Sequence, residues 1–194
     1  MHQVPVYILA GGRSSRFGSD KARAEIAGKP LIVHVAESLR EFDHVLAVAD
    51  CPRKYDDLGV TTIADSQPGL GPIGGLATAV RHARHEWLFV AACDQLDVEP
   101  AWLRELWAQR DAASALAFRT DRWQPMPSLW RRDALPIVEQ QIAAERLALH
   151  ELLDRVDARA VLPPANWPPR PSINTPDDLS HWTRASSDAD HTTP

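Results

Sequence analysis

The sequence predicts one α/β domain built on a doubly wound, mainly parallel sheet with a layer of helices on each face. Short β-rich runs alternate with helical patterns from Val4 to Trp107, which is typical of repeated βαβ units. Two of the runs, "VYIL" and "WLFVAA", are apolar at every position, as strands buried on both faces are. The chain has 194 residues, 44% hydrophobic and 24% charged, which suffices for one sizeable core.

The alternation places the elements in chain order. We expect strands over residues 4–9, 45–48, 60–63 and 88–92, and helices over residues 31–39, 76–83 and 102–107. In doubly wound sheets, ligands bind beyond the carboxyl ends of the strands. The loops that leave these ends carry Gly11, Asp65 and Asp94. We therefore expect three loops to converge on one crevice.

Beyond residue 118 the alternation weakens. The stretch "DRWQPMPSLWRR" is followed by two short helical patterns and by the proline-dense "LPPANWPPRPS" at 162–172. Because no polar linker precedes this part, it is interpreted as a small irregular subregion against the same sheet. "NTPDDL" predicts a last short helix, with Thr175 as N-cap and Pro176 in the first turn. Residues 1–184 are thus expected to form a single domain, with a disordered tail at 185–194.

Charge and cysteine content narrow the partners. The formal net charge of -5 argues against broad capture of nucleic acid or of acidic membranes, and favours small molecules or proteins as partners. No apolar run is long enough to span a bilayer, and the first residues do not resemble a secretory signal, so a cytoplasmic protein is expected. The 2 cysteines lack the spacing of a zinc site or of a disulfide framework.

The segment "YILAGGRSSRFGSDK" has the composition of an anion-binding loop. An apolar strand runs into Gly11 and Gly12, where the backbone can approach an anion and turn its amide groups toward it. Arg13, Arg16 and Lys21 add three cations close to those amides. That much positive charge suits a triphosphate better than a single phosphate.

A second glycine pattern, GxGxxG at Gly69, Gly71 and Gly74, is not interpreted as a dinucleotide loop. Ser66, Gln67 and Pro68 separate the first glycine from Asp65, which follows the preceding strand. Pro72 also lacks the N–H that a pyrophosphate would need. The segment "GLGPIGG" is instead interpreted as a loop that lets a base or a ribose lie against the backbone.

Several motifs occur in the order known from one family. "LAGGRSSRFGSDK" followed by "GKPL" resembles the nucleotidyltransferase signature LAGGxSxRMGxDK...GKPL, in particular that of the molybdenum cofactor guanylyltransferase family. "IADSQPGLGPIGGL", "FVAACD", "WQPMPSLW" and "INTPDDL" resemble further segments of that family, so the resemblance covers most of the chain. It implies a Rossmann-like nucleotidyltransferase fold.

The resemblance also implies an activity: transfer of GMP from GTP to the phosphate of molybdopterin with Mg²⁺, releasing pyrophosphate. Lys21 would neutralise charge on the α-phosphate and the departing pyrophosphate, Asp94 would bind the metal, and Asp65 would accept from the guanine N1–H and N2 amine. The remaining implied contacts are Leu9, Ala10 and Gly11 at the guanine and ribose, and Gly12, Arg13 and Arg16 at the phosphates, with Arg16, Lys21 and Asp94 as the catalytic set. Since the acceptor brings its own phosphate, no side-chain nucleophile is needed.

Some positions depart from the family. Phe17 replaces a methionine, Gln95 and Leu96 replace a Thr-Pro or Met-Pro pair, and Val48 stands where the family can carry a nucleotide-contacting asparagine; Ser172 replaces another asparagine. GTP, molybdopterin and the maturation proteins of molybdoenzymes are the implied partners. Two alternatives remain: a cytidylyltransferase acting on molybdopterin or on a sugar or polyol phosphate, and a nucleotide-binding adaptor without catalysis.

Overall fold

The computed structural model describes residues 3–11, 20–96, 98–111, 113–167 and 173. The strands in this part are β1 (Val6–Leu9), β2 (Glu25–Ile26), β3 (Lys29–Pro30), β4 (Val45–Ala49), β5 (Thr62–Ala64), β6 (Trp87–Ala92), β7 (Ala115–Arg119), β8 (Trp123–Arg131) and β9 (Arg159–Val161). The α-helices are α1 (Leu31–Ser38), α2 (Pro72–His82), α3 (Pro100–Ala108), α4 (Leu135–Ala143) and α5 (Leu149–Arg155), and the 3-10 helices are η1 (Lys21–Arg23), η2 (Asp56–Leu58) and η3 (Arg132–Ala134).

One sheet dominates the molecule. Within the described residues it has seven strands in the order β5-β4-β1-β6-β8-β7-β9. β1 pairs in parallel with β4 and β6, and β4 with β5, while β8 runs antiparallel to both of its neighbours. β9 pairs in parallel with β7. The expected mainly parallel, Rossmann-like sheet is confirmed.

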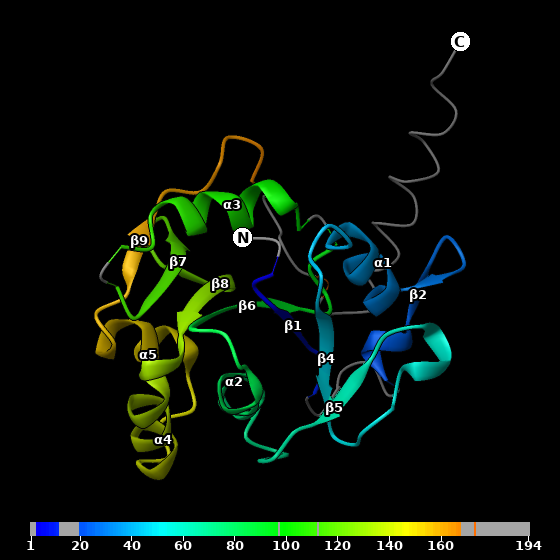
Figure 1. The fold of residues 1–194 in the computed structure, drawn as a ribbon, viewed down its shortest axis with the longest axis horizontal. Helices are drawn as coiled ribbons and strands as arrows, with labels where there is room; N and C mark the ends of the chain where they lie inside the picture. The colour runs from blue at the N-terminus through cyan, green and yellow to red at the C-terminus, as the bar shows by residue number, and fades with distance from the viewer. Residues whose placement is uncertain (1–2, 12–19, 97, 112, 168–172, 174–194) are drawn as a thin grey trace.

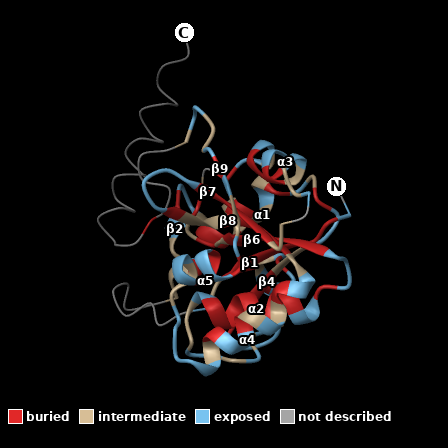
Figure 2. Cartoon of the chain, turned by 90° about the vertical axis from the view of Figure 1, so that its left-hand side faces the viewer, coloured by how far each residue is buried: buried red, intermediate tan, exposed pale blue. Residues whose placement is uncertain are grey.

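Helices cover both faces of this sheet, which gives three layers (Figure 1). Successive residues of β1 point to opposite faces, so Val6 and Ile8 belong to one core cluster while Tyr7 and Leu9 belong to the other. The first cluster includes apolar residues of α1 and α3, and the second includes those of α2, α4 and α5. In Figure 2 the buried residues accordingly run along the sheet and the inner sides of the helices.

Residues 115–161 are more regular than the sequence indicated. "WQPMPSLWR" forms β8, which lies between β6 and β7 in the sheet. Prolines are unusual in a central strand, since proline cannot donate to a ladder. They are accommodated by an irregularity: Ala117 pairs with Ser128, but the next residue, Phe118, pairs with Gln124. The residues from Pro125 to Pro127 are therefore set between two consecutive pairs of the β7–β8 ladder.

The other helix and strand predictions agree with the structure to within a few residues. The largest shift is in α2, which begins at Pro72, four positions before the expected start, because Gly71 takes a positive φ of 71° and the fixed φ of Pro72 suits a first turn. The expected last helix at 174–179 and the tail at 185–194 lie outside the described residues. None of the helices described here has the length and apolar character needed to cross a lipid bilayer.

Candidate functional site

The strand register brings the three expected loops to one edge of the sheet. Leu9 of β1 pairs with Val48 of β4 and with Ala92 of β6, so these strands end at the same level. The backbone N–H of Asp65, just after β5, donates to the carbonyl of Ala49 at 2.6 Å. The loops that follow β1, β4, β5 and β6 therefore leave the sheet side by side, as predicted.

Lys21 and Asp94 meet at this edge. The Lys21 ammonium donates to Oδ2 of Asp94 in an ion pair whose side chains are 16% and 15% exposed. Lys21 is the first residue of η1, whose N-cap Asp20 accepts from the backbone N–H of Ala22 at 3.1 Å. The cation that ends the glycine loop thus lies against the carboxylate that follows β6, in a partly buried position where charges interact more strongly than in water.

The turn that carries Asp94 has supports on both sides. The backbone N–H of Gln95 donates to the Ala92 carbonyl at 3.2 Å, and that of Ile173 donates to the Asp94 carbonyl at 3.1 Å. Ile173 is fully buried with Ile26 and Leu31, and Leu96 packs against the same cluster. Leu96 therefore anchors the turn that carries Asp94 to this apolar cluster.

Cys93 precedes this carboxylate and is buried. Burial raises the pKa of its thiol to about 12, with the negative charge of Asp94 adding to the effect. Because the thiolate is the nucleophilic form of cysteine, a role as nucleophile is not favoured.

Tyr55 belongs to the site, although it was not among the predicted site residues. Its hydroxyl donates to Asp20, 3.1 Å from Oδ2, and lies 3.4 Å from the carbonyl oxygen of Ala10. Burial, with the charge of Asp20 as a second cause, raises the pKa of this phenol, so it remains a donor. Lys54 pairs with both Asp20, at 3.1 Å, and Asp50, at 2.7 Å. One signal was available: "DCPRKYDD" follows the second strand at the ligand-binding edge.

Asp65 lies beside Gly11 and Asp50, with which it lines a small cavity together with Pro68, Gly69 and Gly71. Its Oδ1 accepts from the backbone N–H of Gln67 at 2.9 Å and from the hydroxyl of Thr78 at 2.8 Å. One oxygen of the Asp65 carboxylate therefore stabilises the loop that carries Asp65. Asp50 was not among the predicted site residues; Lys54 lowers the pKa of its carboxyl.

Val48 and Leu9 are buried under α2. Val48 is 1% exposed and lies in the core. The residue near the end of β4 that lines the small cavity is therefore Asp50 and not Val48. The Leu9 side chain is 6% exposed and packs so closely on Gly75 that a Cβ there would lie 3.1 Å from Leu9 Cδ2. Gly11 differs, because among the described residues the atoms nearest to an added Cβ, in Val48 and Ala49, are 3.9 Å away.

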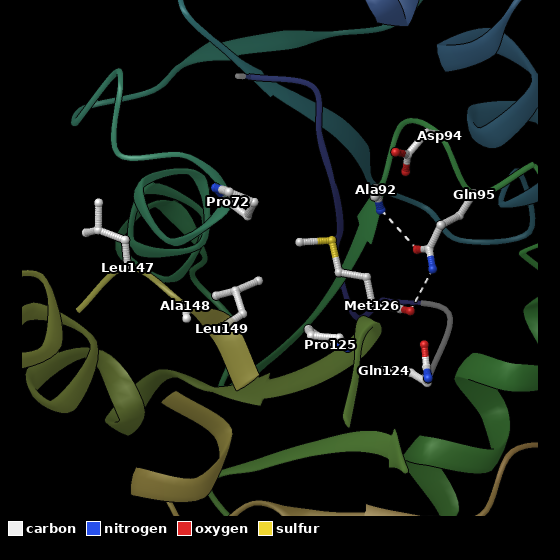
Figure 3. Close-up of a pocket in the computed structure, with 10 residues that line it drawn as sticks. All are labelled: Pro72, Ala92, Asp94, Gln95, Gln124, Pro125, Met126, Leu147, Ala148 and Leu149. Carbon is white, nitrogen blue, oxygen red and sulfur yellow. Dashed lines mark hydrogen bonds between the residues drawn. The ribbon is translucent and has the colours of Figure 1, made fainter. Parts of the chain in front are cut away.

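A larger cavity of about 380 Å³ opens next to Asp94 (Figure 3). This volume is within the range of small-molecule sites. Apolar side chains from α2, β8 and α5 face it together with two carboxamides. Its lining residues are Pro72, Ala92, Asp94, Gln95, Gln124, Pro125, Met126, Leu147, Ala148 and Leu149.

Three predicted phosphate contacts, Gly12, Arg13 and Arg16, lie outside the described residues, as do Phe17 and Ser172. Among the residues described, no three His, Cys, Asp or Glu side chains gather in a way that could hold a metal ion. Mg²⁺ is usually held by one or two carboxylates together with substrate phosphates and water. The partly buried Asp94 carboxylate, which lies at the binding edge of the sheet beside Lys21, fits that requirement.

Comparison with known proteins gives a consistent result. The family model of the MobA-like NTP transferase domain matches residues 6–160. A molybdenum cofactor guanylyltransferase of Pseudomonas entomophila is 34% identical over 164 residues, which is 80% of this chain and 85% of that protein. One of Serratia proteamaculans is 29% identical over 188 residues, which is 94% of this chain and 95% of that protein.

Solved structures show the same likeness. Molybdopterin-guanine dinucleotide biosynthesis protein A of Archaeoglobus fulgidus superposes with a TM-score of 0.78 at 26% identity, covering 95% of this chain and 100% of that one. A CMP:2-keto-3-deoxy-manno-octonic acid synthetase in complex with CTP gives a TM-score of 0.74 at 19% identity, covering 96% and 99% of the two chains, which indicates a shared fold.

Proposed function

The chain belongs to the MobA-like NTP transferase family, and from this premise we propose that it transfers GMP from GTP to the phosphate of molybdopterin. Membership makes it a nucleotidyltransferase. The observation that carries the proposal is the Lys21–Asp94 pair, which lies at the carboxyl edge of the sheet between the end of the glycine loop and the larger cavity.

The reaction requires positioning and charge neutralisation. An oxygen of the acceptor phosphate forms a bond to the α-phosphorus of GTP, and the bond from that phosphorus to the bridging oxygen of the β-phosphate breaks, so pyrophosphate leaves with the electron pair. Negative charge shifts toward the departing oxygen, and a cation placed there stabilises the transition state. Lys21 takes this role, and we assign Arg13 and Arg16 to the same phosphates.

We assign the metal to Asp94. Mg²⁺ bound there would neutralise charge on the phosphate oxygens. Asp94 is suited to hold it because the turn beneath it is fixed by Ala92 and Ile173, so the carboxylate is oriented before substrate arrives. Lys21 keeps the same carboxylate paired in the absence of substrate.

We assign one substrate to each of these two cavities. We place the guanine and ribose over the small cavity, which at about 30 Å³ takes only the edge of a base; Gly11 offers backbone there, and Asp65 offers a carboxylate for the N1–H and N2 donors of guanine. We place the ring system of molybdopterin in the larger cavity, since Met126 and Leu149 provide apolar contact and the adjacent Asp94 marks the reacting centre (Figure 3).

Pyrophosphate release tests the proposal. Each nucleoside triphosphate is supplied with Mg²⁺, with and without molybdopterin, and release is expected only with GTP and the acceptor together. Release with CTP in place of GTP would indicate a cytidylyltransferase. GTP binding without any release would indicate a nucleotide-binding adaptor for molybdoenzyme maturation.

A further inference from the structure

Gln95 replaces a hydrogen bond of the sheet beside the reacting centre. β6 and β8 pair antiparallel, with Trp87 opposite Arg131 and Val90 opposite Ser128. Continued in the same register, the ladder would set Ala92 opposite Met126. The backbone N–H of Arg132 donates to the carbonyl of Glu86 at 2.9 Å. Because hydrogen-bonded pairs alternate along an antiparallel ladder, the even-numbered residues of β6 are the ones that form hydrogen bonds with β8. Ala92 would therefore donate directly to the Met126 carbonyl.

The Gln95 carboxamide occupies that place. Its Oε1 accepts from the backbone N–H of Ala92 at 3.2 Å, and its Nε2 donates to the carbonyl of Met126 at 2.6 Å. Figure 3 shows the amide between these two partners. The side chain is thus inserted between the strands, which separate at this point while their polar backbone groups stay satisfied. With Gln95 only 5% exposed, losing these bonds would leave buried polar groups without partners.

The separation coincides with the larger cavity. Ala92, Gln95 and Met126 all line it, together with Asp94. β8 can move away from β6 here because Met126 lies in the stretch set between two pairs of the β7–β8 ladder. Gln95 also closes the Asp94 turn through its backbone N–H, which donates to the Ala92 carbonyl at 3.2 Å.

From this geometry we propose that Gln95 is a positioning residue for the acceptor: its carboxamide holds β6 and β8 apart to form the acceptor cavity and fixes that cavity relative to Asp94. The inference rests on the proposed function, since it takes the acceptor to be molybdopterin. GTP lies on the other side of Asp94 in this arrangement, at Gly11 and Asp65. Gln95 therefore affects the acceptor and not the nucleotide.

Gln95→Met tests this, because methionine has a similar length but neither donates nor accepts at these backbone groups. We expect the KM for molybdopterin to rise by about tenfold or more, while the KM for GTP and the GTP dissociation constant stay within about twofold. The backbone N–H of Ala92 should also lose protection from hydrogen exchange. Gln140→Met is the matched control, since Gln140 is exposed on α4, and it should change none of these quantities.

Three results would overturn the inference. Unchanged KM values for both substrates would do so, as would an equal rise in both together with a lower melting temperature, which indicates a purely structural role. Wild-type protein that is inactive with GTP and molybdopterin would overturn the proposed function, and this inference with it. Should Gln95→Met not fold, Gln95→Glu serves instead: it can accept from Ala92 but not donate to Met126, and the same split is expected.

Discussion

At the scale of single residues, the site is an arrangement of charges whose partners are already in place. Lys21 and Asp94 are paired, Asp20 is held by Tyr55 and Lys54, and Asp65 is held by Thr78. Side chains fixed in this way lose little freedom when substrates bind, which favours catalysis by positioning. Each residue can then be tested by removing one charge while its neighbours remain.

Replacement of Lys21 by alanine is expected to lower turnover by about a hundredfold or more, the usual loss when a group that stabilises developing charge is removed. Fold and GTP affinity should change far less, because the ammonium acts mainly on the transition state. Steady-state kinetics and circular dichroism measure the two effects. Arg104→Ala, which removes a half-exposed cation of α3 paired with Glu41, is the control and should keep full activity. Turnover of Lys21→Ala within threefold of wild type would contradict the role.

Asp65 is expected to set the preference for GTP. In Asp65→Asn, the carboxylate that suits two guanine donors becomes an amide, so discrimination against CTP and ATP should fall by about tenfold to a hundredfold. Because Asp65 also accepts from Thr78, the variant Thr78→Val separates recognition from loop structure. Thr78→Val should lower stability and keep the GTP preference. Equilibrium binding of the three nucleotides decides: equal affinities in the wild-type protein would rule out the guanine contact.

At the scale of helices and strands, prediction from sequence succeeded where the pattern is local and regular. β1, β4 and β6 are apolar runs before glycine or acidic turns. This pattern can be recognised from the sequence without knowing which residues the strands contact. β8 was missed because the prolines at 125 and 127 are compatible with a strand only once the register shift against β7 exists. Tyr55 was missed for a similar reason, and Gln95 was noted only as a departure from the family, since their partners lie in other elements and no spacing rule connects them. The family and the enzyme class, which rest on ordered motifs, are confirmed by the comparisons.

The start of α2 depends on close packing against the loop before it. A Cβ on Gly74 would lie 2.6 Å from the carbonyl oxygen of Gln67, so Gly74→Ala must push helix and loop apart. We expect a loss of about 1 to 3 kcal/mol in the free energy of unfolding, with weaker GTP binding because the loop moves. Gly11→Ala is the informative comparison. Its Cβ would lie 3.9 Å from the nearest atoms of the described part of the chain, so we expect only nucleotide affinity to fall. Chemical denaturation and GTP titration measure both; wild-type stability in Gly74→Ala would contradict this account.

At the scale of the whole molecule, late parts of the chain return to the site. Trp167 packs against Trp102 and Phe118, with ring centroids 4.8 and 5.0 Å apart, and Ile173 is bound to the Asp94 turn. β8, β7 and β9, the last three strands among the described residues, extend the sheet beyond β6. The larger cavity consequently combines residues from α2, β6, β8 and α5. Acceptor binding therefore depends on both halves of the sequence.

We expect the domain to end near residue 184. Removal of residues 185–194 should leave melting temperature, GTP affinity and turnover unchanged, whereas Ile173→Asp should lower turnover strongly. Ile173 is fully buried beneath the Asp94 turn, and an unpaired charge there carries a large desolvation penalty. Differential scanning fluorimetry and the pyrophosphate assay compare the two proteins. A deletion variant with lower stability would place the boundary further along the chain.

The bond from Ile173 to the Asp94 carbonyl has a consequence for synthesis on the ribosome. β1, β4, β5 and β6, with α1 and α2, are complete once Ala92 has been translated, so a nascent chain can build the nucleotide side of the crevice early. The turn that carries Asp94 acquires its partner in β8 later, and its contact with Ile173 only after residues 95–173 have also been translated. A truncated translation product could therefore hold a nucleotide and still lack an ordered reacting centre.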